Sequence, residues 1–436
     1  MRYLFKVRGL GWGISLIAGV LLLLVIPARL HAQVETQDMA ARVKALEDGL
    51  TAVEAEVQTL QASKANAIQD VLQSAQVNQP QATAPPQQLA SQVTGETGQL
   101  PVYDGATSAG KAFNPDIGII GNFVAVGARN AIKPLPSLSL QESELSMQAV
   151  VDPYARADFF LAFGEQGVEV EEGYVTFTAL PKGVVAKVGK MRAGFGRVNS
   201  FHNHTLPWVD RSLATFNLLG GSLEEADIGI KDAGISVSRI LPSPKGLFLE
   251  GTAEVFRGDS GSLFKSSQRS DVSVVGHLKA YHDFTESTNL EVGGSFARGH
   301  NDLGSACVTR LAGMDATFCW KSLRRAIYHS FTARSELFWS QREQITETQR
   351  AFGWYGSAEY QLGRRWFTGA RYDWSERARN ARQHDSGGSL VLTYWPSEFT
   401  QVRAQLRRTV YAEGKTSNEL LGQVLFTIGA HGAHPF

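Results

Sequence analysis

The sequence predicts an all-β membrane fold, a sixteen-stranded antiparallel transmembrane β-barrel with a short N-terminal coiled-coil helix. Three observations lead to this prediction. The chain starts with an export signal, apolar and polar residues alternate along most of its length, and short connections between the alternating segments take turns with long ones. Strands with one apolar and one polar face can cross a membrane only when they close into a barrel.

The N-terminus, residues 1–32, has the composition of a cleaved secretory signal. Basic residues come first, a strongly apolar run follows at 16–26, and the small Ala32 stands at the predicted cleavage position. The alternative is an uncleaved anchor helix. The mostly apolar run 10–26 is shorter than the ~20 residues of a spanning helix, which favours cleavage. We therefore expect export to the bacterial outer membrane.

Residues 36–71 change to a helical pattern, with apolar residues spaced alternately four and three apart. We expect this helix to self-associate as a coiled coil, with a single amphipathic helix as the alternative, because about three heptads are marginal alone. Residues 72–110, rich in Gln, Ala and Pro, read as a linker. The seam residues are Met39, Val43, Leu46, Leu50, Val53, Val57 and Leu60.

Residues 111–436 form the predicted barrel. In the hairpin 144–163, apolar residues such as Leu145 and Met147 alternate with polar ones, and the alternation resumes after a Pro-containing turn. Period two means an extended strand with two different faces. The weakest of the predicted strands is 314–321, which the sidedness of the turns requires. The sixteen predicted strands are 116–127, 138–151, 154–164, 168–180, 184–192, 231–241, 247–257, 271–283, 288–298, 314–321, 326–340, 352–362, 366–374, 389–395, 399–411 and 418–430.

The connections and strand ends fit a membrane setting. Turns such as 181–183 and 363–365 are short, while the links 193–230, 258–270 and 375–388 are long, as in barrels whose turns are periplasmic. Aromatic residues recur near strand ends, where their rings would lie at the level of the lipid headgroups. A last strand closing on the terminal Phe436 resembles the assembly signal of outer-membrane proteins.

Two stretches resemble known families. The run 188–196, Val-Gly-Lys-Met-Arg-Ala-Gly-Phe-Gly, and the order of signal, coiled coil, linker and barrel resemble the phosphate-selective porins O and P, although Gly194 replaces an expected proline. That resemblance implies a sixteen-stranded, trimeric channel. The segments 201–210 and 429–436 resemble outer-membrane proteins labelled zinc-regulated or TonB-dependent. The chain is too short for the plugged barrel of about 22 strands that a TonB-dependent receptor needs.

The function that this fold predicts is a porin, a water-filled channel for passive diffusion of small hydrophilic solutes or ions, with anions as candidates. Lumen-facing charges set such selectivity. The predicted pore-lining residues are Arg156, Asp158, Lys187, Glu250, Glu254, Arg371, Arg403 and Arg407. Further lumen charges are Glu144, Glu172, Lys279, Glu291, Arg334, Glu336, Glu359 and Asp373. The set is mixed in sign, so charges paired across the lumen are the alternative to an anion-attracting strip.

A metal site is the second chemical candidate. In an extended segment, alternate residues point to the same side, so His202 and His204 can reach one cation, with Asp210 close by. No cofactor is otherwise expected, with zinc the candidate at this place. The alternative is a structured loop that folds into the lumen. His431 and His434 belong at the other end of the predicted barrel and cannot complete this site.

Several other functions are disfavoured. The net charge of zero offers no basic footprint for nucleic acid. An enzyme is not expected, because His329 and Ser335 are six residues apart, about 20 Å along a strand. Cys307 and Cys319 are predicted to lie at different heights, which argues against a disulfide. The expected partners are outer-membrane lipid, small solutes and two further copies of the chain. A metal- or ligand-binding barrel for uptake, or a structural envelope tether, remains the alternative function.

Overall fold

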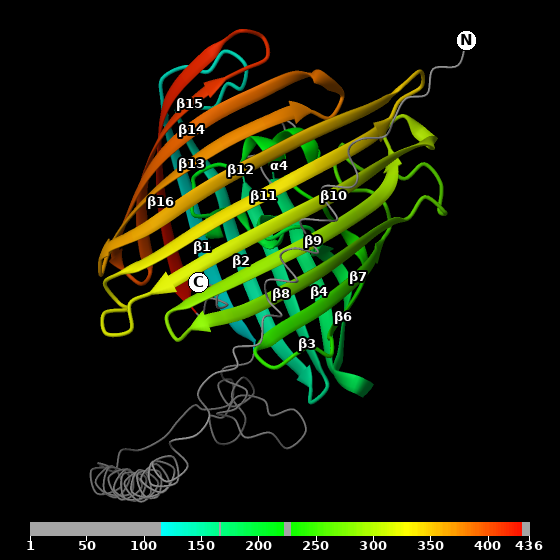
Figure 1. Cartoon of the computed structure of the whole chain (residues 1–436), viewed down its shortest axis with the longest axis horizontal. Coiled ribbons are helices and arrows are strands. Elements are labelled where there is room, and N and C mark those ends of the chain that lie inside the picture. The colour runs from blue at the N-terminus through cyan, green and yellow to red at the C-terminus, as the bar shows by residue number, and fades with distance from the viewer. Residues whose placement is uncertain (1–114, 165–166, 222–227, 430–436) are drawn as a thin grey trace, which may run out of the picture. The chain divides into compact units, whose positions relative to one another are not determined.

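The chain forms a closed antiparallel barrel in which β1 pairs with β16 (Figure 1). The computed structural model describes residues 115–164, 167–221 and 228–429. The predicted signal (1–32), coiled coil (36–71) and linker (72–110) lie outside the described residues, as do His431, His434 and Phe436. Within the described part, no helix has the length and apolarity of a membrane-crossing helix.

The prediction of sixteen strands is confirmed, and each strand pairs with its neighbours in sequence. The strands are β1 Asp116–Gly127, β2 Leu138–Asp152, β3 Ala155–Gly164, β4 Gly167–Leu180, β5 Val184–Arg192, β6 Lys231–Ile240, β7 Leu247–Phe256, β8 Ser273–Thr285, β9 Thr288–Asn301, β10 Gly304–Lys321, β11 Ser330–Glu343, β12 Thr348–Gly363, β13 Trp366–Arg377, β14 Asn380–Ser397, β15 Thr400–Val410 and β16 Thr416–Gly429.

Two of the connections predicted to be long, 375–388 and the one before the strand 314–321, are short turns between longer strands. Residues 375–388 do not form a loop, because β13 runs to Arg377 and β14 starts at Asn380 as one tall hairpin. The strand predicted at 314–321 starts already at Gly304. Around 375–388 both faces carry polar residues, so the hydrophobic alternation disappears although the backbone ladder continues. In 304–313 the alternation is lost for another reason, because Leu311 is apolar and packs in the core inside the barrel.

The outer face of the barrel is apolar, and the inner face is polar except where the wall packs against apolar residues of the connection between β5 and β6. On β13, Tyr372 points outward and is 49% exposed, whereas Arg371 and Asp373 point inward and are buried. Leu390, opposite Ala370 in the β13–β14 ladder, is 62% exposed on the same outer surface. An outer surface of this kind suits lipid contact.

Aromatic side chains mark two levels on the outer wall. Near the short turns, the rings of Trp366 and Tyr394 stack with centroids 4.4 Å apart. Toward the other end, Phe352 lies 6.0 Å from Trp374, which stacks on His384. Trp366 and Trp374 are separated by about 26 Å along β13. With a strand tilt near 40°, the two belts are about 20 Å apart in height, close to the apolar band of about 25 Å of outer-membrane barrels.

The core lies inside the barrel. The connection between β5 and β6, called here the lumenal loop (described residues 193–221 and 228–230), turns inward with the short helices η2 (Val198–Ser200), η3 (Asn203–Thr205) and α4 (Leu213–Leu218) (Figure 1). Phe195 packs on Phe338 of β11, and Trp208 packs on Tyr355 of β12. η1 (Pro181–Gly183) forms one of the short turns. The loop therefore crosses the lumen and narrows it.

Candidate functional site

The lumenal loop is held by acceptors on the barrel wall. Its backbone amides donate to side chains of five strands, among them Ser295 of β9, which accepts the amide of Gly196 at 2.8 Å. Each acceptor faces inward because it alternates with outward residues. These bonds satisfy buried backbone groups that form no ladder of their own. Further amide–acceptor pairs are Gly194–Glu254 at 2.8 Å, Val198–Glu336 at 3.1 Å, Val209–Gln405 at 2.8 Å and Leu213–Asp373 at 3.2 Å.

Arg403 on β15 supports the loop from the opposite direction. Its guanidinium donates to the carbonyl oxygens of Leu206, at 2.7 Å, and Trp208, at 3.2 Å, and to the side chain of Gln423. Arg403 is buried beneath the loop. It was predicted to line the pore, and its described hydrogen bonds instead fasten the loop to the wall.

Asp210 is the centre of an ion cluster. Its carboxylate lies 3.0 Å from Arg371 and 2.8 Å from Arg407, and it accepts a hydrogen bond from Gln405. Burial opposes the charged form, but the two guanidinium groups outweigh it and hold the pKa of Asp210 well below its usual range. The structure thus separates Asp210 from the histidines with which the sequence grouped it, and it neutralises two of the predicted pore arginines.

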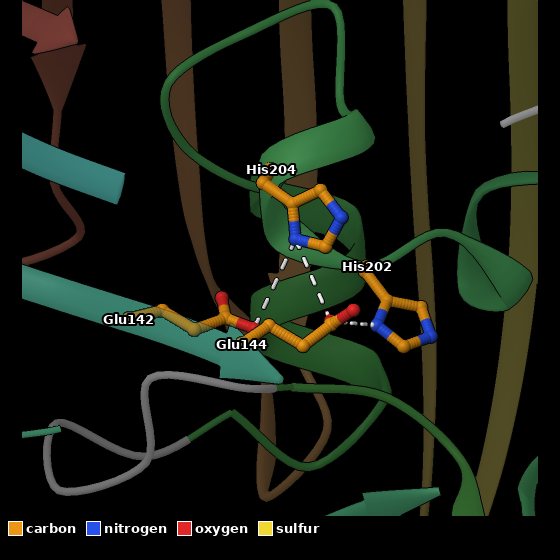
Figure 2. Close-up of side chains that lie close together, drawn as sticks. All are labelled: Glu142, Glu144, His202 and His204. Carbon is orange, nitrogen blue, oxygen red and sulfur yellow. Dashed lines mark hydrogen bonds and ion pairs between the residues drawn. The ribbon is translucent and has the colours of Figure 1, made fainter. Parts of the chain in front are cut away.

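His202 and His204 instead meet Glu142 and Glu144 of β2 (Figure 2). His202 also meets two glutamates of β4. The group of Glu142, Glu144, Glu171, Glu172, His202 and His204 is called here the carboxylate–histidine cluster. All six side chains are buried. Glu142 and Glu144 share the inner face of β2 because they are two residues apart.

A β-bulge on β4 places two further carboxylates in the cluster. Phe160 of β3 pairs with Glu172 and the next residue of β3 pairs with Val170, so Glu171 is an extra residue in the ladder. A bulge redirects side chains, and both Glu171 and Glu172 are therefore buried on the lumen side. The ring of Phe160 packs edge-on against His202 at 5.1 Å.

His202 is clamped between carboxylates through both ring nitrogens. Nδ1 lies 2.7 Å from Glu144 and 3.3 Å from Glu171, and Nε2 lies 2.9 Å from Glu172. Burial disfavours the charged imidazole, but Glu171 and the hydrogen bonds to the neighbouring carboxylates raise the pKa of His202 well above its usual value. His204 Nδ1 lies 3.7 Å from Glu144 and 3.9 Å from Glu142.

The other predicted pore residues divide into two groups. Glu254, Arg371, Arg403 and Arg407 contact the lumenal loop or its ion cluster. Toward the short turns, Arg156 pairs with Asp158 at 2.9 Å, and Glu250 pairs with Lys279 at 2.8 Å. Lys187 lies over the ring of Tyr174. The inner wall at this end therefore carries charged side chains that pair with one another and are partly exposed to water.

A cavity of about 730 Å³ lies on the long-loop side of the lumenal loop. Its wall combines side chains of both signs, so the cavity presents no single-sign surface. The basic residues are Lys133, Lys190, Arg211, Lys231, Arg257 and Arg407, and the acidic ones are Glu142, Glu169, Glu171, Asp210, Asp232 and Asp259.

Sequence reasoning treated Glu144 and Glu172 only as lumen charges and did not single out Glu142 or Glu171. The adjacent pair Glu171-Glu172 was the available signal, because two neighbouring polar residues break the alternation of an otherwise regular strand. Cys307 and Cys319 are both free.

Comparisons with known proteins place this fold in a class. No protein-family model matches the chain. An uncharacterised protein of Aquifex aeolicus is 29% identical over 400 residues, which cover 78% of this chain and 83% of that protein. Among solved structures, the anion-selective porin from Comamonas acidovorans has a TM-score of 0.51 at 11% identity, over 72% of this chain and 98% of that one. OprB of Pseudomonas putida has a TM-score of 0.49 at 8% identity, over 74% and 97%. The barrel is porin-like in fold.

Proposed function

We propose that this chain is an outer-membrane porin through which small hydrophilic solutes and ions diffuse passively. The observation that carries the proposal is the combination of a lipid-suited outer wall with a charged inner wall in one closed barrel. A soluble barrel has no reason to expose Leu390 and Tyr372 while burying Arg371 and Asp373. The lumenal loop sets the narrowest part of the path, as loops do in channels whose selectivity depends on local lining groups.

The proposed channel has only a weak preference between ions. Arg371 and Arg407, two candidates for an anion-attracting strip, share the counter-charge of Asp210. Arg156 and Lys279 are paired with carboxylates in the partly open half of the lumen. Paired charges leave little net field along the path.

We also propose that three copies associate in the membrane. The resemblance to trimeric porins of the O and P type supports this, and the outer wall offers a depression lined by small residues of β12 to β14, among them Gly356, Ala370 and Gly388. Small residues permit close approach of a neighbouring barrel. Native mass spectrometry of wild-type protein and of Gly388→Trp tests the assembly, with trimers expected for the first and monomers for the second.

Liposome swelling with sugars of increasing size tests the channel itself. We expect fast swelling with small sugars and a sharp size limit, and reversal potentials in a salt gradient close to zero. Vesicles that contain folded protein and yet do not swell with any sugar would contradict the proposal.

A further inference from the structure

The carboxylate–histidine cluster contains carboxylate oxygens without a hydrogen-bond partner among the described residues. Glu142 is 6% exposed, and within this part of the chain neither of its carboxylate oxygens accepts a hydrogen bond. The same holds for Oε1 of Glu144, which is 1% exposed. Burying an ionised carboxylate without a partner is costly, so such groups normally coordinate a cation or pair with one. The cluster therefore has an unmet requirement for positive charge.

The donor atoms around this charge suit a transition metal. One atom from each of Glu142, Glu144, His202 and His204 lies within 4.8 Å of the others, as the converging side chains in Figure 2 illustrate. We propose that these four residues bind one divalent transition-metal ion of the zinc type. Two imidazole nitrogens favour zinc over calcium or magnesium, which take oxygen ligands.

The required adjustment is small. Zinc bonds of about 2.0–2.2 Å in a tetrahedron place the donor atoms about 3.4 Å apart. His202 Nδ1 and Glu144 are already 2.7 Å apart, and His204 Nδ1 lies 3.7 Å from Glu144. Rotations of His204 and Glu142 close the remaining gap, and the ion takes the place of the proton on Nδ1 of His202.

The surroundings of His202 are those of a metal ligand. Its second nitrogen, Nε2, lies 2.9 Å from Glu172, and a metal-bound histidine usually donates its other N–H to a carboxylate in this way. Glu172 is itself fixed, because its other oxygen accepts the amide of Arg192 at 2.6 Å. Glu171 lies 3.2 Å from the Arg192 guanidinium. Contacts with Arg192 thus fix the positions of Glu171 and Glu172 next to the proposed metal ligands.

The charges also balance. The cluster has four carboxylates, and the nearest arginines that act on it are Arg192 and Arg211. A divalent ion with neutral histidines cancels the excess of negative charge. The ion would join β2 to the lumenal loop across 58 positions of sequence, since Glu144 and His202 are both ligands. It would therefore fix the loop at one side of the lumen.

Zinc binding to the full, exported chain in detergent tests the site. The protein is purified without a histidine tag, in a background with His431→Gln and His434→Gln, stripped with chelator and titrated with zinc against a chromogenic competitor. We expect one zinc per chain. Glu142→Gln and His204→Gln should each weaken binding more than tenfold, and Glu172→Gln by about 10-fold to 100-fold.

The control is His277→Gln on β8, a lumenal histidine that contacts Ser295 and no member of the cluster. It should bind zinc like the parent chain. X-ray absorption of the parent should give nitrogen and oxygen neighbours at about 2.0–2.1 Å, with imidazole scattering. Glu142→Gln removes a buried charge whose oxygens accept no hydrogen bond from the described residues, so it should fold at least as well as the parent, and heat-dependent gel mobility checks this. Substoichiometric zinc in the parent, or undiminished binding in both Glu142→Gln and His204→Gln, would overturn the proposal.

Discussion

The guanidinium of Arg371 on β13 and the carboxylate of Asp210 in the lumenal loop lie 3.0 Å apart, and Arg371 is 3% exposed. Asp210 also faces Arg407 on β15 at 2.8 Å. Each arginine also has a carboxylate partner on the wall, Asp373 for Arg371 at 2.7 Å and Glu419 for Arg407 at 2.8 Å. Asp210 is the group that joins the loop to both arginines, and its charge-assisted hydrogen bonds are lost when its carboxylate is removed.

Asp210→Asn should therefore destabilise the loop. We expect the free energy of unfolding to fall by roughly 1.5–3 kcal/mol, because hydrogen bonds between charged groups are lost, and the channel current to become noisier. Urea titration in detergent, followed by tryptophan fluorescence, measures the first effect. The matched control is Asp158→Asn, whose partner Arg156 is half exposed, so that less than about 1 kcal/mol should be lost. Equal losses of unfolding free energy in the two variants would show that Asp210 stabilises the protein no more than a partly exposed ion pair does.

Glu336→Leu should release the first part of the loop. Glu336 accepts the amides of Arg197 and Val198 and the hydroxyl of Tyr355, and all three donors lose their partner in the variant. Each unsatisfied buried donor costs about 1–3 kcal/mol, so the loop should move away from the wall. We expect a higher limit of sugar size in liposome swelling. Glu359→Leu, also predicted to face the lumen, should leave the limit unchanged.

Much of the fold was predictable because lipid outside and water inside impose an alternation of period two on each strand. The path of the lumenal loop was not predictable, because its amides bind partners 60 and 196 positions away, as for Gly194 with Glu254 and Val209 with Gln405. Proximity in sequence suggested Asp210 as a partner of the histidines. The fold of the loop gave them Glu142 and Glu144 instead, and the bulge on β4 added Glu171 and Glu172.

Lys133, in the connection between β1 and β2, should give stability a measurable pH dependence. Burial lowers its pKa to about 7, and Arg407 and Arg377 add to this, against the opposite effect of Asp385 and Asp210. Between pH 7 and the ordinary value of 10.5, the unfolded chain keeps a proton that the folded chain has lost, so stability rises with pH.

The difference between parent and Lys133→Met isolates this contribution. The slope of the difference should not exceed about 1.4 kcal/mol per pH unit and should vanish below pH 7. Urea titrations at several pH values measure it. Parallel curves for the two proteins from pH 7 to 10 would mean that Lys133 keeps its proton in the folded chain.

Leu278→Arg tests the membrane-facing surface. Leu278 is 49% exposed near the middle of β8 and lies outside the depression proposed for the contact between copies. An arginine at the midplane should cost about 2–4 kcal/mol in lipid vesicles. Leu303→Arg, in the turn between β9 and β10, is an exposed control that should cost little. Similar small effects at both positions would indicate that the belt between the aromatic rings does not contact lipid.

Single-channel recording in planar bilayers tests the central claim most directly, namely that this barrel encloses a water-filled path across a membrane. The purified protein should give steady ohmic steps, grouped in threes, with a reversal potential near zero in a salt gradient. Bilayers that contain inserted, folded protein and yet show no conductance would contradict the account.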